Sequence, residues 1–453
     1  MSLGTVVSRL AGHKTFARGV HPHDWKELSS QAAIELVDTP ASVCVPLVQH
    51  AGAPAEPVVQ ARQIVTLGQL LGQNKAFITA PVHAPIAGAV SAPSMTTLAN
   101  GRHVPCLSIQ AQGEQLAGRA LWEDLFGGDW PSGGFDRFSD QQISQAVRDA
   151  GLVGLGGAGF PTHVKLARNP NKPVDTLLVN GSECEPYLTA DYRLMLEAPK
   201  PIITGAILLA RAAGAGRIVI ALEDNKPDAV ASLRAAAQGT DIQVVATVTK
   251  YPMGGEKQLI VAVLGRAVPT GGLPLDCGVV VVNVGTSAAA ARAVLRGKPL
   301  THRIVTVSGR GVNRPCNLLA PVGMTYGQLI HIAGGLNDRA RRVLAGGPMM
   351  GFAVSDLSLP ITKGTSGITV LIDEDLASAE QTNCVKCGRC ADVCPLNLVP
   401  TRLAQSARAK NWDLARRYYI TACMECGCCA YACPASIPLV QIIRAGKAGM
   451  PKR

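Results

Sequence analysis

Short apolar segments separated by Gly and Pro dominate residues 21–112. Segments of this length, bounded by turn-forming residues, are typical of strands in an all-β domain. The clearest candidates are 42–47, 61–67, 77–80 and 88–91. The pattern predicts a small β-domain over residues 21–112, followed by a linker with turns over residues 113–138.

The pattern changes after residue 139, where apolar residues first recur at helical spacing. Ile143, Ala146 and Val147 line one face of a helix predicted over 141–150. Continuous apolar runs follow, with helical stretches between them, and this alternation is typical of a parallel sheet covered by helices. The sequence therefore predicts an α/β domain over residues 139–300. The predicted strands are 176–180, 217–222 and 278–283, and the helices between them are 201–213 and 227–237.

Two further segments complete the pattern. Residues 301–370 return to short strands with Gly-rich turns, and residues 371–453 are mostly helical, with helices predicted over 399–409 and 413–420. The predicted fold class is multidomain α/β.

Length and composition indicate the size of the protein and the environment in which it folds. The chain has 453 residues, of which 47% are hydrophobic, so it can bury several cores, and its length corresponds to roughly three domains. The most apolar windows, 201–222 and 277–295, are interrupted by Arg211, Arg217 and Arg292, so no membrane-spanning helix is expected. The first ten residues lack the pattern of a signal peptide. We therefore expect a soluble or peripheral protein.

The formal net charge is +11. Such an excess fits either a solvated surface or an anionic partner, namely a dinucleotide, an acidic redox protein or an anionic membrane face. Nucleic acid is not an expected partner, because only 4% of residues are aromatic and the sequence has no helix-turn-helix signature or dense Lys/Arg run.

Most of the fourteen cysteines crowd into residues 384–433. Because no export signal is expected, metal or cluster ligation is the expected chemistry rather than a disulfide framework. Two complete runs with the spacing C-x2-C-x2-C-x3-C-P occur here, each of the kind found in bacterial ferredoxins. The cysteines are Cys384, Cys387, Cys390 and Cys394 in the first run, and Cys423, Cys426, Cys429 and Cys433 in the second.

In this motif three cysteines wrap one [4Fe–4S] cluster and the fourth ligates the neighbouring cluster. Zinc fits less well, because it prefers two separated pairs of ligands. Cys428 lies outside the pattern and is expected to be a buried thiol rather than a ligand. The two clusters imply electron transfer. The predicted ligand sets are Cys384, Cys387, Cys390 and Cys433 for one cluster, and Cys423, Cys426, Cys429 and Cys394 for the other.

A glycine-rich loop, GLGGAGFPTHVK, occupies residues 154–165. It satisfies the G-x-G-x-x-G pattern, but a dinucleotide fingerprint would follow a strand, and here a helix is predicted before it. Backbone without side chains beside a helix start exposes amides to a phosphate, and Lys165 follows shortly after. From the residues alone, a phosphate loop and a plain tight turn both remain open.

This loop resembles the flavin loop of the NADH-binding subunit of respiratory complex I. Three further segments resemble that family in the same order: NGSECEP at 180–186, YPMGGE at 251–256 and VNVGT at 282–286. Two positions depart from the family, because Gly255 replaces a Glu and Ser182 replaces an Asp.

The β-domain segments around 61–71 and 84–90 resemble the flattened barrel of biotinyl and lipoyl carriers. Lys75 lies where such carriers hold their modified lysine, but its flanking residues and spacing do not match. We therefore read Lys75 as a solvated loop residue.

Nearly the whole chain resembles the RnfC family. Proteins of this family are subunits of the Rnf complex, which is a membrane-bound ferredoxin:NAD oxidoreductase. The quoted motifs are GVHP at 19–22, APVHA at 80–84, YPMGGEK at 251–257, AGGPMMG at 345–351 and the double cysteine run. The resemblance implies a lipoyl-like β-barrel, an α/β flavin/NADH domain, a small soluble-ligand-binding β-grasp-like domain and a helical two-cluster ferredoxin domain. Arg18 stands where that family usually has Gly.

The resemblance also implies the cofactors and their residues. FMN would be held without a covalent bond, NAD(H) would be the dinucleotide, and no side chain would act as a catalytic acid or base. The cofactor-binding residues would be Gly154, Gly156, Gly157 and Lys165 at the phosphate and ribityl chain, Asn180, Gly254 and Asn283 at the isoalloxazine, Phe160, Glu185 and Glu256 at the dinucleotide, and Glu183 and Tyr251 in the same segments.

The same resemblance implies partner proteins and a cellular location. The chain would be a peripheral subunit at the cytoplasmic face of the bacterial inner membrane. It would contact the other Rnf proteins and exchange electrons indirectly with ferredoxin or flavodoxin. Two alternatives remain open: a microcompartment cobalamin reductase with the same flavin loop and clusters but another domain order, and a non-catalytic scaffold that only conducts electrons.

Overall fold

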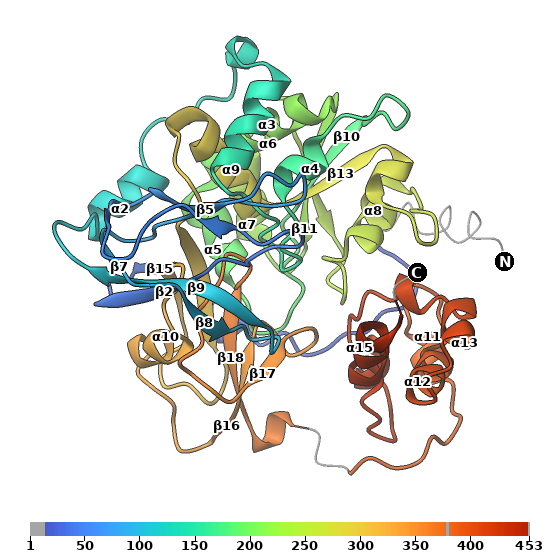
Figure 1. The fold of residues 1–453 in the computed structure, drawn as a ribbon. Helices are drawn as coiled ribbons and strands as arrows, with labels where there is room; N and C mark the ends of the chain where they lie inside the picture. Colours follow the sequence, from blue (N-terminus) through green and yellow to red (C-terminus); the bar gives the residue numbers. More distant parts are fainter. Residues whose placement is uncertain (1–13, 377–379, 452–453) are drawn as a thin grey trace.

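A computed structural model describes residues 14–376 and 380–451. The first ten residues, which lack a signal-peptide pattern, lie outside this range. Figure 1 shows a β-rich N-terminal part, a central α/β layer, a second sheet domain and a separate bundle of helices at the C-terminal end. None of the helices in the described ranges is both long and apolar enough to span a membrane.

The N-terminal β-domain consists of two antiparallel sheets around an apolar interior that includes Val45, Leu71 and Ile109. The strands of the larger sheet are β2 (Ser42–Pro46), β4 (Ile64–Val65), β7 (Gly88–Val90), β8 (Ser94–Thr97) and β9 (His103–Ala111). Those of the smaller sheet are β3 (Glu56–Pro57), β5 (Leu70–Gln73) and β6 (Val82–His83).

The strand predicted over 77–80 is wrong, because these residues form the loop between β5 and β6. Phe77 and Ile78 are exposed by 58% and 41%, so their apolar side chains do not face the core. Ile78 and Thr79 instead bond to Ala53, through Ala53 N donating to the Ile78 carbonyl and Thr79 Oγ1 donating to the Ala53 carbonyl.

The linker predicted over 113–138 contains more structure than turns. Helix α2 (Gly118–Leu125) buries Leu121 and Leu125 one helical turn apart, and a 3₁₀ turn follows at Phe135–Arg137. The flanking glycines concealed this short amphipathic helix in the sequence pattern.

The central α/β domain is a parallel sheet in the order β12-β11-β10-β13. The predicted strands are confirmed as β10 (Thr176–Asn180), β11 (Arg217–Glu223) and β13 (Val279–Asn283). Edge strand β12 (Gln243–Thr247) was not predicted; its apolar residues Val244, Val245 and Ala246 are only half-buried at the edge of the sheet. The helices are α3 (Asp140–Asp149), α4 (Thr162–Leu166), α5 (Ala190–Glu197), α6 (Pro199–Ala213), α7 (Pro227–Ala236), α8 (Glu256–Leu264) and α9 (Val284–Arg296).

Helices α6 and α9 pack closely against each other because Gly205 has no side chain. A Cβ atom on Gly205 would lie 1.8 Å from the Ser287 carbonyl oxygen. This packing fixes the helix that follows β13, and therefore the carboxyl end of that strand.

The second sheet domain is mixed, in the order β1-β15-β14-β18-β16-β17. β1 (Ile34–Leu36) comes from the predicted range of the N-terminal β-domain, but it pairs in parallel with β15 (Cys316–Pro321). This sheet and the N-terminal β-domain share one buried apolar cluster. The remaining elements are β14 (His302–Ser308), α10 (Tyr326–Ile332), β16 (Ala340–Ala345), β17 (Phe352–Val354) and β18 (Gly367–Ile372).

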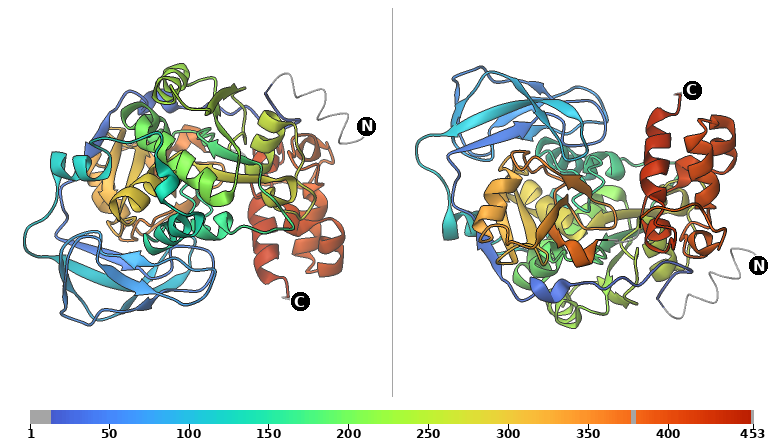
Figure 2. Two further views of the ribbon diagram at one scale, coloured as in Figure 1. Left: turned by 90° about the horizontal axis from the view of Figure 1, so that it is seen from above. Right: turned by 90° about the horizontal axis from the view of Figure 1, so that it is seen from below.

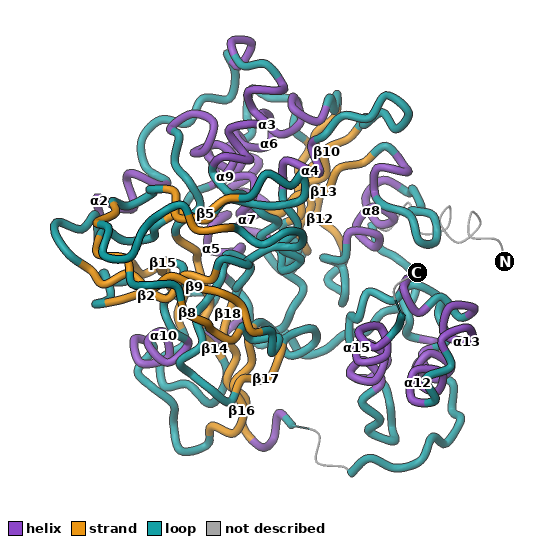
Figure 3. Tube along the Cα trace, in the orientation of Figure 1, coloured by secondary structure: helices purple, strands orange, loops and turns teal. Residues whose placement is uncertain are grey.

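The C-terminal helical domain, residues 380–451, has its own apolar core. Its described residues form helices and loops without strands (Figure 3). Both views in Figure 2 place it on the opposite side of the α/β domain from the N-terminal β-domain. The helices are α11 (Arg389–Asp392), α12 (Pro400–Arg408), α13 (Trp412–Arg417), α14 (Cys428–Tyr431) and α15 (Leu439–Gly449).

Candidate flavin and iron–sulfur site

Two asparagines meet at the carboxyl ends of adjacent parallel strands. Asn180 ends β10 and Asn283 ends β13, and the two residues are paired in the sheet register. Asn180 Nδ2 donates to the Gly254 carbonyl at 2.8 Å, and Asn283 Nδ2 donates to Asp191 Oδ2 at 2.6 Å. Crevices at this edge of an open parallel sheet are where ligands bind in α/β proteins.

The glycine-rich loop lies beside this edge with its backbone uncovered. Leu155 N donates to Thr286 Oγ1 at 3.0 Å, which ties the loop to the start of α9. Gly156 and Gly157 are exposed, and a Cβ atom on Gly156 would face Asn283 at 3.5 Å, in ordinary contact. The helix preceding the loop, α3, is confirmed, so the loop is not a Rossmann turn. Uncovered amides beside a strand end fit a phosphate and its flexible chain.

Three of the predicted cofactor residues lie around this loop. Lys165, on α4, forms an ion pair with Glu256 at the start of α8, and its Nζ also donates to the Val281 carbonyl at 3.1 Å. Phe160 is half-buried, and its carbonyl accepts from Gly154 N at 2.8 Å. The fold thus brings Gly154, Phe160, Lys165 and Glu256 to the same edge as Asn180 and Asn283.

The two predicted acids of the NGSECEP segment are already held by backbone amides. Glu183 accepts from Asp191 N at 2.8 Å and Tyr192 N at 3.1 Å, so it caps the first turn of α5. Glu185 accepts from Met349 N at 3.0 Å and Met350 N at 2.8 Å. Burial raises the pKa of Glu185 to about 7.

One cavity in the C-terminal helical domain is lined by five cysteines, of which four, from both runs, are predicted ligands: Cys394, Cys423, Cys426 and Cys429. The fifth is Cys428. We call the four predicted ligands the inner set. Four thiols around one small apolar cavity fit the donor set of a [4Fe–4S] cluster.

The remaining four predicted ligands form the outer set: Cys384, Cys387, Cys390 and Cys433. Cys384 and Cys387 are exposed. Thr382 N donates to the Ala435 carbonyl at 3.1 Å, so the beginning of the first run lies beside the end of the second. This pairing fits a shared cluster between the first three cysteines and Cys433, and the ligand assignment stays a prediction.

The α/β domain touches the inner set directly. Tyr251 is buried, and its hydroxyl donates to the Cys426 carbonyl at 2.6 Å. Tyr251 packs with Cys184, Cys426 and Cys428 in one apolar cluster. The predicted role of Tyr251 near the flavin thus coincides with a contact to the cysteine runs.

Domain families match the chain in four places. They are the RnfC barrel sandwich hybrid domain at 14–114, the Nuo51 FMN-binding domain at 147–292, the SLBB domain at 304–353 and the 4Fe-4S dicluster domain at 380–437. The RnfC protein of the proton-translocating ferredoxin:NAD(+) oxidoreductase complex of Clostridium ljungdahlii is 41% identical over 90% of this chain and 87% of its own length.

The chain belongs to the RnfC family of the ion-translocating oxidoreductase (Rnf) complexes. The RnfC protein of the Na(+)-translocating complex of Acetobacterium woodii is 39% identical over 88% of this chain and 89% of its own length. The RnfC protein of the Rhodobacter capsulatus complex is 39% identical over 96% of this chain and 83% of its own length. A solved NAD+-reducing [NiFe]-hydrogenase aligns with a TM-score of 0.47 at 25% identity, covering 61% of this chain and 54% of its own.

Membership in the RnfC family establishes the general class of protein to which the chain belongs. It is an oxidoreductase subunit of a larger complex, with an FMN-binding domain and a 4Fe–4S dicluster domain. The relatives favour the Rnf prediction over the cobalamin reductase alternative. The predicted relation to the flavin subunit of complex I is confirmed by the Nuo51 match.

Sequence reasoning missed three charged residues that shape the site. Lys26 Nζ donates to the carbonyls of Glu183, Glu185 and Leu188, and Lys226 Nζ donates to the Ser182 carbonyl. Asp191 accepts from Asn283, and burial together with the charge of Glu183 raises its pKa to about 7. Their partners are far apart in sequence, so local patterns gave no signal.

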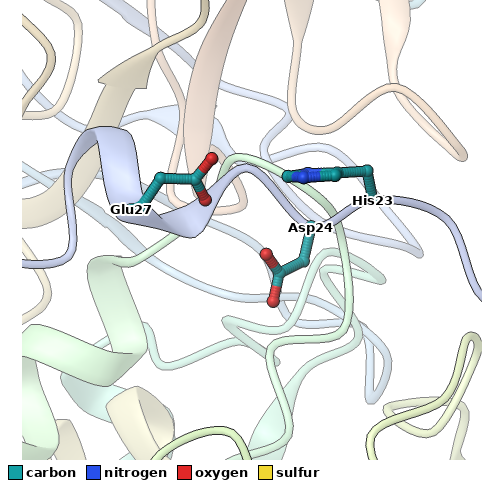
Figure 4. Close-up of side chains that lie close together, drawn as sticks. All are labelled: His23, Asp24 and Glu27. Carbon is teal, nitrogen blue, oxygen red and sulfur yellow. The ribbon is translucent and has the colours of Figure 1, made fainter.

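A second group of possible metal ligands lies at the surface. His23, Asp24 and Glu27 place one ligand atom each within 4.8 Å of one another (Figure 4). Asp24 Oδ2 already accepts from Asn225 Nδ2 at 3.1 Å, and His23 Nδ1 accepts from Trp25 N at 3.2 Å. These hydrogen bonds explain why the three side chains lie close together without a metal ion.

Proposed function

We propose that this chain passes electrons between NAD(H), FMN and two [4Fe–4S] clusters, toward or from ferredoxin. It would do so as the peripheral subunit of an ion-translocating complex at the cytoplasmic face of the bacterial membrane. The main support for this proposal is the buried contact between Tyr251, in the predicted flavin segment YPMGGE, and the inner cysteine set. The names of the relatives, which belong to ferredoxin:NAD(+) oxidoreductase complexes, support the proposal.

The proposed flavin residues follow from the geometry of the crevice. Gly154, Gly156 and Gly157 would hold the phosphate and ribityl chain with their amides, and Lys165 would add a positive charge. Asn180, Asn283 and Gly254 would line the ring. Phe160 and Glu256 would contact the dinucleotide.

Bound FMN supplies the chemistry, because a flavin accepts two electrons as a hydride and passes them on singly. The side chains orient the cofactors and exclude water around them. Tyr251 and Cys426 are buried at this contact, so it would exclude solvent between the crevice and the inner set. The inner set, next to this contact, would hold the first cluster on the path, and the outer set would hold the second.

Replacement of Gly156 tests the flavin site. Gly156→Val should weaken FMN binding by more than about tenfold, because a branched side chain covers the amides that a phosphate needs. A Cβ atom on Gly156 would lie no closer than 3.5 Å to its neighbours, in ordinary contact, so we expect the variant to fold. FMN occupancy is measured by fluorescence of the released flavin, and iron content reports the clusters.

Gly216→Val is the matched control, because Gly216 is an exposed glycine of the same domain whose Cβ would meet nothing within 4 Å. Both variants should retain their iron. Full FMN occupancy in Gly156→Val would exclude the 154–159 loop as the phosphate site.

A further inference from the structure

The turn at 346–351, which forms most of the AGGPMMG segment, lies between β16 and β17, and the function proposed above assigns it no role. It belongs to the second sheet domain, yet its contacts lead out of that domain on two sides. One side reaches the NGSECEP segment of the α/β domain, and the other reaches the second cysteine run.

On the flavin side, the turn is fastened by one carboxylate. The two oxygens of Glu185 accept from Met349 N and Met350 N. A Cβ atom on Gly347 would lie 2.3 Å from Glu185 Oε2, so the turn can approach the carboxylate only with glycine at this position. Lys26 Nζ, at 3.1 Å from the Glu185 carbonyl, holds the backbone of the acid.

On the cluster side, the turn supports the loop of the second run. Gly427 lies between two predicted ligands, with φ +88°, and its Cβ would lie 2.6 Å from the Met349 carbonyl oxygen. Arg444, on α15, donates to the Met350 carbonyl at 3.4 Å and forms an ion pair with Glu425 at 2.9 Å. The turn therefore lies in direct contact with the loop that carries the inner set.

We propose that Glu185 is a positioning residue: its carboxylate holds the 346–351 turn, and the turn seats the inner cysteine set against the flavin crevice. This inference rests on the proposed function and gives Glu185 a role other than the dinucleotide contact that the family resemblance implies. Two amides on one carboxyl group fix both the distance and the orientation of the turn, and above the pKa of Glu185 both hydrogen bonds are charge-assisted.

The test separates flavin reduction from cluster reduction. In Glu185→Gln one of the two amides loses its acceptor and faces an NH₂ group, so the turn loosens while the side-chain size is kept. Stopped-flow absorbance follows flavin reduction by NADH, and rapid-freeze paramagnetic spectra follow cluster reduction. We expect cluster reduction to slow by on the order of tenfold, since small displacements of reacting groups lower rates steeply. Flavin reduction and the KM for NADH should stay near wild type.

A matched pair of glycine variants probes the other side of the turn. Gly427→Ala should slow cluster reduction in the same way, because its methyl group meets the Met349 carbonyl. Gly388, the corresponding residue of the first run, has a similar φ of +81° but meets nothing within 4 Å. Gly388→Ala therefore carries the same backbone strain without the contact, and should transfer electrons at the wild-type rate with full iron content.

Two outcomes would overturn the inference. If Glu185→Gln raises the KM for NADH and leaves cluster reduction at saturating NADH unchanged, Glu185 is a dinucleotide ligand. If Gly427→Ala and Gly388→Ala behave alike, the turn does not seat the inner set. Failure of wild-type protein to reduce its clusters with NADH would instead refute the proposed function itself.

Discussion

Lys363 shows how a single buried charge can join three domains. It lies in the second sheet domain and is only 1% exposed, and its Nζ donates to the Pro81 carbonyl at 2.6 Å and the Gly151 carbonyl at 2.7 Å. Pro81 belongs to the N-terminal β-domain, and Gly151 shortly precedes the glycine-rich loop. Burial lowers the pKa of Lys363 to about 7.

This pKa predicts a pH-dependent stability. Between about pH 7 and the ordinary lysine value near 10.4, the unfolded chain binds a proton at Lys363 that the folded chain does not. The free energy of unfolding therefore rises with pH in this window, by up to about 1.4 kcal/mol per pH unit, and this dependence is absent below it. Lys363→Met removes the titrating group.

Urea unfolding of the wild type and of Lys363→Met across this window measures the effect. The stability of the wild type relative to the variant should increase as the pH rises above about 7. A difference that does not change with pH would mean that Lys363 keeps an ordinary pKa in the folded protein.

At the scale of elements, the two cysteine runs repeat one backbone conformation. Lys386 and Glu425, at corresponding positions, have φ of 56° and 60°, and Asn397 and Ser436 have φ of 56° and 50°. Helices α12 and α15, which follow the two runs, pack against each other. A repeat of this kind places the fourth cysteine of each run near the other run.

Crossed ligation can be tested with single serine variants, because a serine hydroxyl is a poor ligand where soft thiolate is preferred. Cys394→Ser should perturb the same paramagnetic signal as Cys426→Ser, and Cys433→Ser the same signal as Cys387→Ser. Cys428→Ser is the control, since Cys428 lines the same cavity but lies outside the motif. It should retain both signals. If Cys394→Ser perturbs the Cys387→Ser signal instead, each run holds its own cluster.

Elements were predictable where one local pattern determined them. Strands β10, β11 and β13 are continuous apolar runs, and α3 has its buried Ile143 and Val147 at helical spacing. The segment at 77–80 was wrongly predicted as a strand, because its largest apolar residues, Phe77 and Ile78, are exposed.

The same distinction holds for the site. Residues at strand ends and in the glycine-rich loop could be placed from the sequence, since topology brings them together. The amides that hold Glu185 are 164 and 165 residues away, and such a pairing depends on how whole domains pack.

Among the residues that the structure describes, one edge of the C-terminal helical domain is exposed rather than packed against the other domains. The α/β domain contacts the inner set, while residues 381–389, which include Cys384 and Cys387, are exposed. Val385, between them, is 65% exposed, and Lys386 and Arg389 are exposed beside it. We expect electrons to leave or enter the protein at this edge of a basic domain, because residues 380–453 hold eleven Lys or Arg and four Asp or Glu.

Anionic and cationic one-electron acceptors should distinguish this edge from the rest of the surface. Protein reduced by NADH should transfer electrons to ferricyanide faster at low salt, and the rate should fall as ionic strength approaches about 0.1 M, where charges are screened over about 10 Å. Hexaammineruthenium(III), a cation, should show the opposite dependence on salt.

In the double variant Lys386→Glu/Arg389→Glu, the ferricyanide rate at low salt should drop by on the order of tenfold, because local charge governs the rate of encounter. Lys75→Glu/Arg102→Glu makes the same charge change at exposed residues of another domain, the N-terminal β-domain, and should retain most of the rate. Equal losses in the two double variants would show that net charge alone, and not the edge around Cys384 and Cys387, governs the exchange.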